Sequence, residues 1–206
     1  EFEPALAFLA QSLSTGTNAA DDVSADILSN DAKVSFVVPY RDELTPLDQH
    51  AGLRLADGTE ITMGFAETTR GCKHLCRHCP VVPVYKGRFR AIPADIVLAD
   101  IRAQVAMGAR HISFGDPDFL NGPGHATRVL TAMHAEFPDL TFDAVIKVEH
   151  LLKHREMLSF LKECGCQFII SAVESVDDDV LERLAKGHTR DDFFEATHLL
   201  RSLNIG

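Results

Sequence analysis

The fold of this chain is organised around residues 71–80, which read GCKHLCRHCP and follow an apolar, strand-like run at 61–66. Cys72, Cys76 and Cys79 have the spacing C-x3-C-x2-C, and thiolates this close together can converge on one face of a small metal centre. A 4Fe–4S cubane bound by only three cysteines keeps one iron open for a substrate or cofactor. The spacing therefore predicts an iron–sulfur site.

A zinc site is the competing interpretation, in which these thiolates would be joined by His74 or His78. Tetrahedral zinc usually takes two ligands from each of two separated pairs, and we expect no second C-x2-C or H-x3-H pair downstream to complete such a site. Cys164 and Cys166 stand together before a later strand-like run instead. The spacing favours iron–sulfur over zinc.

Downstream of the cysteines, short apolar runs alternate with helical patterns. This alternation indicates an α/β fold with parallel strands. Four βα units, followed by the start of a fifth strand at 204–206, favour a partial (β/α) TIM-like barrel over a short open sheet. The last full strand is apolar enough to be buried on both faces. The expected strands are 61–66, 111–114, 141–148 and 168–173.

Helical patterns follow each expected strand. The first opens at Pro93 and ends near Gly108, and the second carries Val129, Leu130 and Met133. The third extends from Leu151 towards Gly165. Two more helices should follow the fourth strand, with Asp177 and Asp191 as their N-caps.

Residues 1–60 have a different character, and we expect them to be the remnant of an N-terminal domain with a linker and a hairpin. The barrel would then occupy residues 61–206 and be truncated at its C-terminus, because the chain starts at Glu1 rather than Met and stops where a strand begins. Within the first part we expect a helix at 4–13, a linker at 16–30, a strand at 33–38 and a hairpin at 53–61 that turns at Asp57–Gly58.

Composition and charge restrict the function further. The 206 residues are 46% apolar, which is typical of a globular protein with a core. The net charge of −10 disfavours a nucleic-acid-binding surface, which needs clustered Lys and Arg. No run approaches the ~20 apolar residues of a membrane span, and no secretion signal is visible. Five cysteines, three of them clustered, do not look like a disulfide framework, so a reduced cytoplasm is expected.

The motif C-x3-C-x2-C after the first strand of a repeating βα chain resembles the radical S-adenosylmethionine (SAM) superfamily. The resemblance covers residues 61–206 and implies a cluster at the C-terminal ends of the strands, the usual functional face of such barrels. It also implies that the SAM amino and carboxylate groups chelate the open iron. One electron, from a reductant such as flavodoxin or ferredoxin, would then cleave SAM to methionine and a 5′-deoxyadenosyl radical.

The family's Gly-Gly-Glu-Pro motif has a counterpart in Phe114–Pro117, which reads Phe-Gly-Asp-Pro. By resemblance, Gly115 and Asp116 would receive the SAM amino group, with Ser113 beside them at the end of the strand. A carboxylate can accept hydrogen bonds from an amine, and glycine permits close approach of the backbone. Phe114 departs from the family pattern, and a turn without function is the alternative interpretation.

The family's Gly-Val-Glu-Ser motif, followed later by Lys-Gly, resembles residues 172–175 and 186–187. Glu174 is therefore expected to accept hydrogen bonds from the ribose hydroxyls of SAM. Ser171 lies on the same strand face as Val173 and could also line the site. Alternatively, Glu174 could lie near the cap of the following helix.

Two basic residues complete the predicted cofactor site. Lys147, near the end of the third strand, could pair with the SAM carboxylate or with the substrate, although a surface lysine is the alternative. His78 precedes the last cysteine, where the family's backbone meets adenine, and could stack there. His74 is expected at the surface, and no catalytic residue is assigned.

The residues around the motifs are similar to those in the branch of the superfamily whose barrel follows a cobalamin-type domain. Within that branch, they are similar to those of proteins with a Cys-Cys-Ala-Glu-Pro or selenocysteine-containing tail. That branch would allow bound cobalamin and methyl transfer, or aminocarboxypropyl transfer from SAM, but residues 1–60 contain no Asp-x-His-x-x-Gly motif. The expected function is a radical SAM enzyme, and the acidic charge favours a small-molecule substrate. The alternative is a zinc- or cluster-stabilised binding module without catalysis, in which Asp116 and Glu174 would lie far from the cysteines.

Overall fold

The computed structural model describes residues 35–41, 43–50, 52–55 and 57–206. The chain divides into two compact units, Glu1–Val37 and Val38–Gly206, and nearly all described residues belong to the second. The helix expected at 4–13 and the linker expected at 16–30 lie outside the described residues. The strand expected at 33–38 is wrong for its described part, because residues 35–38 are not in a strand.

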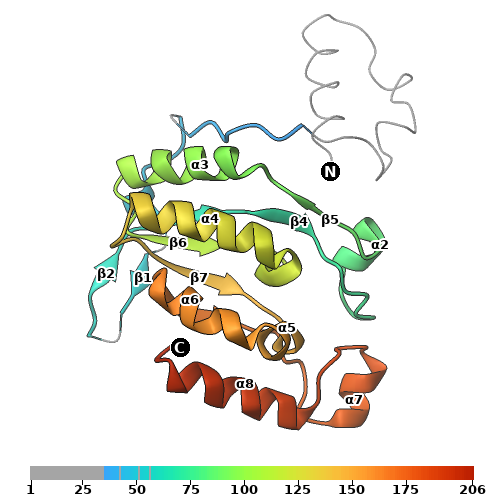
Figure 1. The fold of residues 1–206 in the computed structure, drawn as a ribbon. Coiled ribbons are helices and arrows are strands. Elements are labelled where there is room, and N and C mark those ends of the chain that lie inside the picture. Colours follow the sequence, from blue (N-terminus) through green and yellow to red (C-terminus); the bar gives the residue numbers. More distant parts are fainter. Residues whose placement is uncertain (1–34, 42, 51, 56) are drawn as a thin grey trace, which may run out of the picture. The chain divides into compact units, whose positions relative to one another are not determined.

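A four-stranded parallel sheet forms the centre of the second unit (Figure 1). The strands pair in the order in which they follow along the chain, and helical segments connect them. Consecutive parallel pairing with helical crossovers is the arrangement of a (β/α) barrel, so the predicted fold class is confirmed. In pairing order the strands are β3 (Met63–Ala66), β6 (His111–Phe114), β7 (Thr141–Val145) and β8 (Cys166–Ile170).

The core lies between this sheet and the helices that follow its strands. Ile112, Phe114 and Phe142 are fully buried on the strands. On the helices α3 (Ala94–Ala106), α4 (Pro123–Glu136) and α6 (Leu158–Glu163), the residues Ile101, Leu130 and Leu161 are equally buried. Burial of each such side chain stabilises the fold by about 1.5–3 kcal/mol relative to an exposed position. The apolar faces of the helices, visible as periodicity in the sequence, therefore stabilise the sheet against which they pack.

Polar contacts from α3 cover the free edge of β3. The Gln104 side chain accepts a hydrogen bond from the Phe65 amide at 2.8 Å and donates one to the Phe65 carbonyl at 2.9 Å. Arg41 also donates to the Phe65 carbonyl and forms an ion pair with buried Asp100. These contacts fix the strand that leads into the cysteine loop.

Two short antiparallel pairs flank the sheet. Strands β1 (Leu53–Arg54) and β2 (Glu60–Ile61) form the hairpin expected at 53–61, and the Gly58 amide closes its turn on the Leu55 carbonyl. Strands β4 (Thr69–Gly71) and β5 (Phe89–Ala91) pair on either side of the cysteine loop, which contains the short helix α2 (Val81–Tyr85). The loop is therefore held at both ends. A single-turn helix, η1 (Leu47–Gln49), precedes β1.

The segment after β7 differs from the expected continuous strand and helix. The strand ends at Val145 rather than at 148, because Val148 is the first residue of α5 (Val148–Lys153). The helix expected from Leu151 towards Gly165 is divided into α5, a single turn η3 (Arg155–Met157) and α6. The break lets Leu151, Leu158 and Leu161 all be buried.

The last two helices are α7 (Asp178–Arg183) and α8 (Arg190–Ser202). Asp177 caps α7 through a hydrogen bond from the Val180 amide, as predicted. The expected cap of α8, Asp191, is wrong by two residues. Thr189 is the N-cap and forms a reciprocal capping box with Asp192, which satisfies two backbone amides at once.

Strand β8 is not buried on both faces, contrary to the expectation for residues 168–173. Ile170 is 49% exposed, and the strand ends there rather than at 173. On the free edge of β8, the Gly206 amide donates to the Gln167 carbonyl and the Ile169 amide donates to the Gly206 carbonyl, each at 2.9 Å. This is the hydrogen-bond pattern of a parallel strand and agrees with the expected strand start at 204–206. None of the described helices is long and apolar enough to cross a membrane.

Candidate functional site

A cavity of about 290 Å³ lies where β7 and β8 end and where the cysteine loop passes over the sheet. We call it the cysteine cavity. Its position at the carboxyl ends of parallel strands is the place where such barrels carry their active sites. The residues that give it chemistry are Cys72, Cys76, Cys79, Lys147, Glu174 and Lys186.

The donor set of the cysteine cavity fits a cluster bound by three thiolates. Cys76 is buried at 6% exposure, while Cys72 and Cys79 are partly exposed. The Cys79 amide donates to the Cys76 carbonyl at 3.2 Å, so these two residues belong to one turn. Among the described residues the remaining cysteines, Cys164 and Cys166, are buried elsewhere and do not line this cavity.

Asn121 fixes the backbone around the first cysteine from η2 (Phe119–Asn121), the single turn after β6. Its side-chain oxygen accepts a hydrogen bond from the Lys73 amide at 3.1 Å, and its amide group donates to the Gly71 carbonyl at 3.3 Å. The Cys72 thiol also points at this oxygen, at 3.8 Å. Gly71 has φ 86°, and a Cβ there would collide with Tyr85, so this turn requires glycine.

The protonation of Cys72 depends on what the cavity contains. Burial raises the pKa of its thiol, and the negative charge of Asp118 adds to that effect. The metal-free thiol is therefore protonated at neutral pH. A metal must displace this proton to bind the thiolate, which couples metal affinity to pH.

Opposite charges alternate along the wall formed by the segments after β7 and β8. Glu174 lies 3.1 Å from His78 Nε2 and 3.6 Å from Lys186 Nζ. Lys186 is only 3% exposed, so its charge is compensated mainly by this carboxylate. Lys147 lies across the cavity and pairs with Glu149 at 3.1 Å. A wall with both signs of charge suits a zwitterionic ligand.

Four predicted SAM contacts do not line the cysteine cavity. Asp116 is fully buried and accepts hydrogen bonds from the Thr68 amide at 2.9 Å, the Thr68 hydroxyl at 2.8 Å and the Thr69 hydroxyl at 2.6 Å. Burial raises the pKa of this carboxyl, and the three hydrogen bonds oppose that rise. Ser113 donates to Asp143 at 2.8 Å. The Ser113 hydroxyl and the Asp116 carboxylate are thus both hydrogen-bonded within the protein, which leaves them little capacity to bind a ligand.

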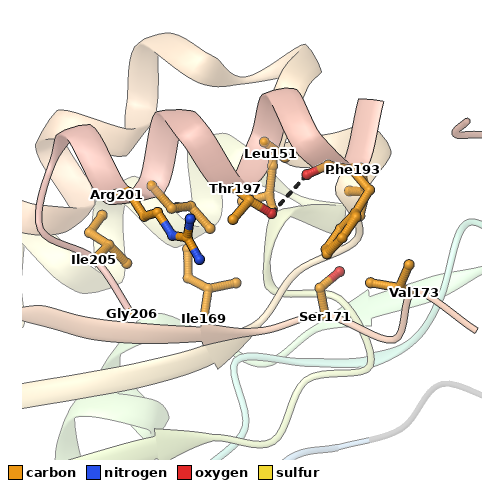
Figure 2. A pocket seen from close by; sticks show the side chains of 12 residues that line it. Leu151, Ile169, Ser171, Val173, Phe193, Thr197, Arg201, Ile205 and Gly206 are labelled. Carbon is orange, nitrogen blue, oxygen red and sulfur yellow. Dashed lines mark hydrogen bonds between the residues drawn. The ribbon is translucent and has the colours of Figure 1, made fainter. Parts of the chain in front are cut away.

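Ser171 belongs to a different cavity, of about 440 Å³, between β8 and α8 (Figure 2). Figure 2 shows its hydroxyl among mostly apolar side chains, with Thr197 and Phe193 on the helix opposite. Gly115 lies beneath the ring of Phe65, which occupies the space that a Cβ would need. The structure thus brings His78, Lys147 and Glu174 to the cysteines, whereas Ser113, Gly115, Asp116 and Ser171 lie elsewhere.

His74 was expected at the surface, and this is wrong. Its side chain is 15% exposed and faces Asp118 and His150, and it lines the cysteine cavity. The expectation that no H-x3-H pair follows the cysteines is wrong, because His150 on α5 and His154 at the C-terminal cap of that helix form such a pair. Asn121 carried no signal in the sequence, since its role depends on contacts with residues about fifty positions earlier.

The comparisons with known proteins agree with this geometry. The family profile described as "Radical SAM superfamily" matches residues 66–206. A tRNA-2-methylthio-N(6)-dimethylallyladenosine synthase of Chlorobium phaeobacteroides is 28% identical over 172 residues, which are 77% of this chain and 37% of that protein. The ribosomal protein uS12 methylthiotransferase RimO of Nitratidesulfovibrio vulgaris is 26% identical over 198 residues, which are 88% of this chain and 44% of that protein. The chain therefore spans less than half the length of these relatives.

Solved structures show the same fold. The radical SAM methyltransferase TsrM of Kitasatospora setae, with tryptophan and a SAM analogue bound, has a TM-score of 0.59 at 21% identity over 69% of this chain and 29% of that chain. The cobalamin-dependent SAM radical enzyme OxsB has a TM-score of 0.60 at 21% identity over 69% of this chain and 22% of that chain. At this identity the likeness concerns the fold alone.

Proposed function

The chain belongs to the radical SAM superfamily, and from this premise we propose that Cys72, Cys76 and Cys79 hold a 4Fe–4S cluster at which SAM is bound and reductively cleaved. When bound, the cluster supplies an open iron for SAM and the electron that breaks a bond of its sulfonium. The observation that carries the proposal is that all three thiols line one cavity together with Lys147, Glu174 and Lys186.

The charged wall provides the groups that SAM requires. Lys147 would bind the SAM carboxylate, and Glu174 would accept hydrogen bonds from the ribose hydroxyls or the amino group. His78, which touches Glu174, can stack on adenine. Lys186 is only 3% exposed, and its burial strengthens its charged contact with Glu174.

Asp116 enters the proposal as a positioning residue, because its carboxylate is occupied by Thr68 and Thr69. These threonines begin the segment that leads through β4 to Cys72. Asp116 and Asn121 therefore set the course of the cysteine loop from the same neighbouring loop. The Gly115–Pro117 segment reaches the cavity itself through Pro117.

The competing function is a zinc- or cluster-stabilised binding module without catalysis. Such a module predicts that neither Asp116 nor Glu174 approaches the cysteines. Glu174 lines their cavity and Asp116 does not, so the convergence of Glu174 with Lys147 and Lys186 is what favours the enzyme.

The substrate class rests on charge and on the names of relatives. A net charge of −10 supports a small-molecule substrate, whereas the named relatives act on a tRNA or a ribosomal protein. Those names also make methyl or methylthio transfer the first reactions to assay after SAM cleavage. Cobalamin binding, supported by a cobalamin-containing structure of the same fold, is tested by adding the corrinoid to the same assay.

The deciding experiment is anaerobic reconstitution of the full-length protein with iron and sulfide, followed by electron paramagnetic resonance with and without SAM. We expect a reduced-cubane signal that shifts when SAM is added. We also expect Cys76→Ala to abolish SAM cleavage, because only two thiolates would remain.

The matched control for that variant is Cys164→Ala, which removes a buried thiol away from the cavity and should leave the signal and SAM cleavage unchanged. Uptake of zinc without a cluster, or full SAM cleavage by Cys76→Ala, would overturn the proposal in favour of the binding module.

A further inference from the structure

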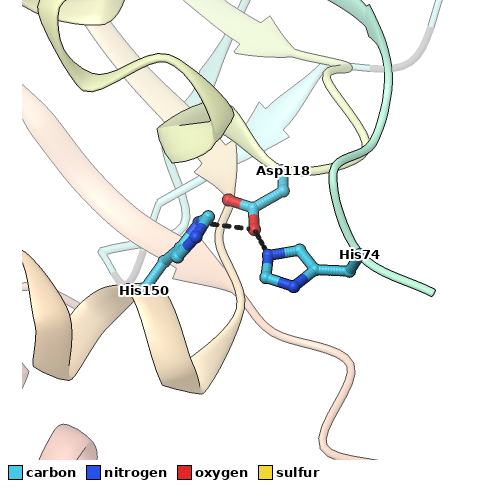
Figure 3. A group of neighbouring side chains, drawn as sticks. All are labelled: His74, Asp118 and His150. Atoms are coloured by element: carbon cyan, nitrogen blue, oxygen red, sulfur yellow. Dashed lines mark ion pairs between the residues drawn. The ribbon is translucent and has the colours of Figure 1, made fainter. Parts of the chain in front are cut away.

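Three side chains from separate segments meet beside the cysteine cavity (Figure 3). Asp118 Oδ2 lies 2.8 Å from His150 Nδ1 and 3.3 Å from His74 Nε2. Figure 3 shows His74 on the cysteine loop, Asp118 on the loop after β6 and His150 on α5, all directed at one point. The three ligand atoms lie within 4.8 Å of one another. We call this group the His-Asp-His cluster.

The three facing atoms are not satisfied by hydrogen bonds. His74 Nε2, Asp118 Oδ2 and His150 Nδ1 are each buried without a hydrogen-bond partner of acceptable geometry. Asp118 Oδ2 faces both imidazole nitrogens at ion-pair distance, so the three atoms form one buried polar group. A cation between them would satisfy all three at once.

The outer contacts of the cluster are those of metal ligands. His74 presents its other ring nitrogen, Nδ1, to Glu149 Oε2 at 3.5 Å, and a histidine that binds a metal commonly orients its second nitrogen towards a carboxylate in this way. Asp118 is held by its other oxygen, which accepts a hydrogen bond from the Leu120 amide at 3.1 Å. His74 and Asp118 are thus each held by an outer contact while their facing atoms are directed inward.

We propose that His74, Asp118 and His150 bind a divalent first-row transition metal, such as zinc or ferrous iron, at a site separate from the cysteines. Two imidazoles and one carboxylate are a donor set that such ions favour, and protein ligands lie about 2.0–2.2 Å from zinc, so the present spacing closes on an ion with small side-chain movements. Three protein ligands leave a coordination position open. His74 also lines the cysteine cavity, so the open position would be reached from there. The proposal does not rest on SAM cleavage.

The test separates this site from the cysteines by replacing Cys72, Cys76 and Cys79 with Ser in the full chain. Titrated with Co²⁺ alone, this variant is expected to bind one equivalent with d–d absorption and no thiolate charge-transfer band. Adding His74→Ala should weaken Co²⁺ binding at least ~10–100-fold, because even the loss of a residue that only orients a metal ligand lowers metal affinity by that factor. His198→Ala, which removes an exposed imidazole on α8, is the matched control and should change nothing.

Two results of this titration would overturn the site. The first is a folded triple-Ser protein that shows no saturable Co²⁺ binding, which would mean that protonated imidazoles alone compensate Asp118. The second is binding that His74→Ala does not weaken.

A second measurement covers the case in which the triple-Ser variant does not fold. Zinc is added to the cluster-loaded protein, and its X-ray absorption fine structure is recorded. Nitrogen and oxygen ligands at about 2.0–2.2 Å support the proposal, whereas sulfur at about 2.3 Å places the zinc on the cysteines and contradicts it.

Discussion

Glu174 has a backbone conformation that few residues other than glycine adopt, with φ 70°. For an ordinary L-residue this costs roughly 1–2 kcal/mol. The conformation brings its carboxylate between His78 and Lys186 at the cysteine cavity. Strain retained at a site of this kind indicates that the position of the carboxylate matters more than local stability.

Glu174→Gln is expected to weaken SAM binding by about tenfold or more, because a hydrogen bond to a charged group contributes about 1.5–3 kcal/mol. Calorimetric titration of the cluster-loaded protein with SAM measures the change. Glu182→Gln on α7 makes the same charge change at an exposed position and serves as control. Equal SAM affinity in the two variants would exclude Glu174 from the SAM site.

Asp116 illustrates a different role, that of a buried acceptor. Asp116→Ala leaves the Thr68 amide and two threonine hydroxyls without their partner, and each buried unsatisfied group costs about 1–3 kcal/mol. We expect a lower urea midpoint and reduced cluster content, both partly restored by Asp116→Asn. If the Ala variant unfolds normally but loses only SAM affinity, Asp116 is a direct SAM ligand instead.

At the scale of elements, some predictions from local signals are confirmed, whereas the predicted N-cap of α8 is wrong. The helix from Pro93 and the strand 111–114 follow from periodicity and a terminating glycine, and both are present. The burial of β8 was mispredicted because an apolar run does not reveal that its strand lies at a sheet edge. The positions of His74 and Asp116 could not be predicted, since each depends on a partner more than forty residues away.

The start of α8 provides a pH-dependent test. Thr189→Ala removes the capping box and should lower the free energy of unfolding by about 1 kcal/mol at neutral pH. Hydrogen bonds from Thr189 hold the pKa of Asp192 below its ordinary value of 3.8. A lowered folded-state pKa gives stability that is present above 3.8 and lost as pH falls through the folded value.

The difference between wild type and Thr189→Ala should therefore shrink in urea titrations carried out below about pH 4, where an unpaired Asp is protonated. A difference that is constant with pH would mean that the Thr189 hydroxyl caps α8 without help from the Asp192 charge.

At the scale of the whole molecule, the excess of acidic residues should control which partners approach. A net charge of −10 disfavours the basic surface that phosphate contacts require. Proteins that neutralise phosphates lose affinity steeply between 50 and 200 mM salt, roughly 1,000-fold or more for six contacts.

We accordingly expect weak binding of bulk tRNA by this chain and little dependence on salt over that range, as measured by filter binding. A steep salt dependence would show that the chain contributes a phosphate-binding surface and would favour an RNA substrate.

The hydrogen bonds of Asp116 and Asn121 that hold the two ends of the segment 68–73, here called the buried clamp, also bear on the order in which the chain folds. The clamp joins residues 47 to 50 positions apart in the chain, and contacts at such separation form only after much of the chain has collapsed. During synthesis the cysteines emerge first but have no template until β6 and its loop have docked. If Cys72, Cys76 and Cys79 hold a cluster as proposed, we therefore expect it to be inserted into a barrel that has already folded.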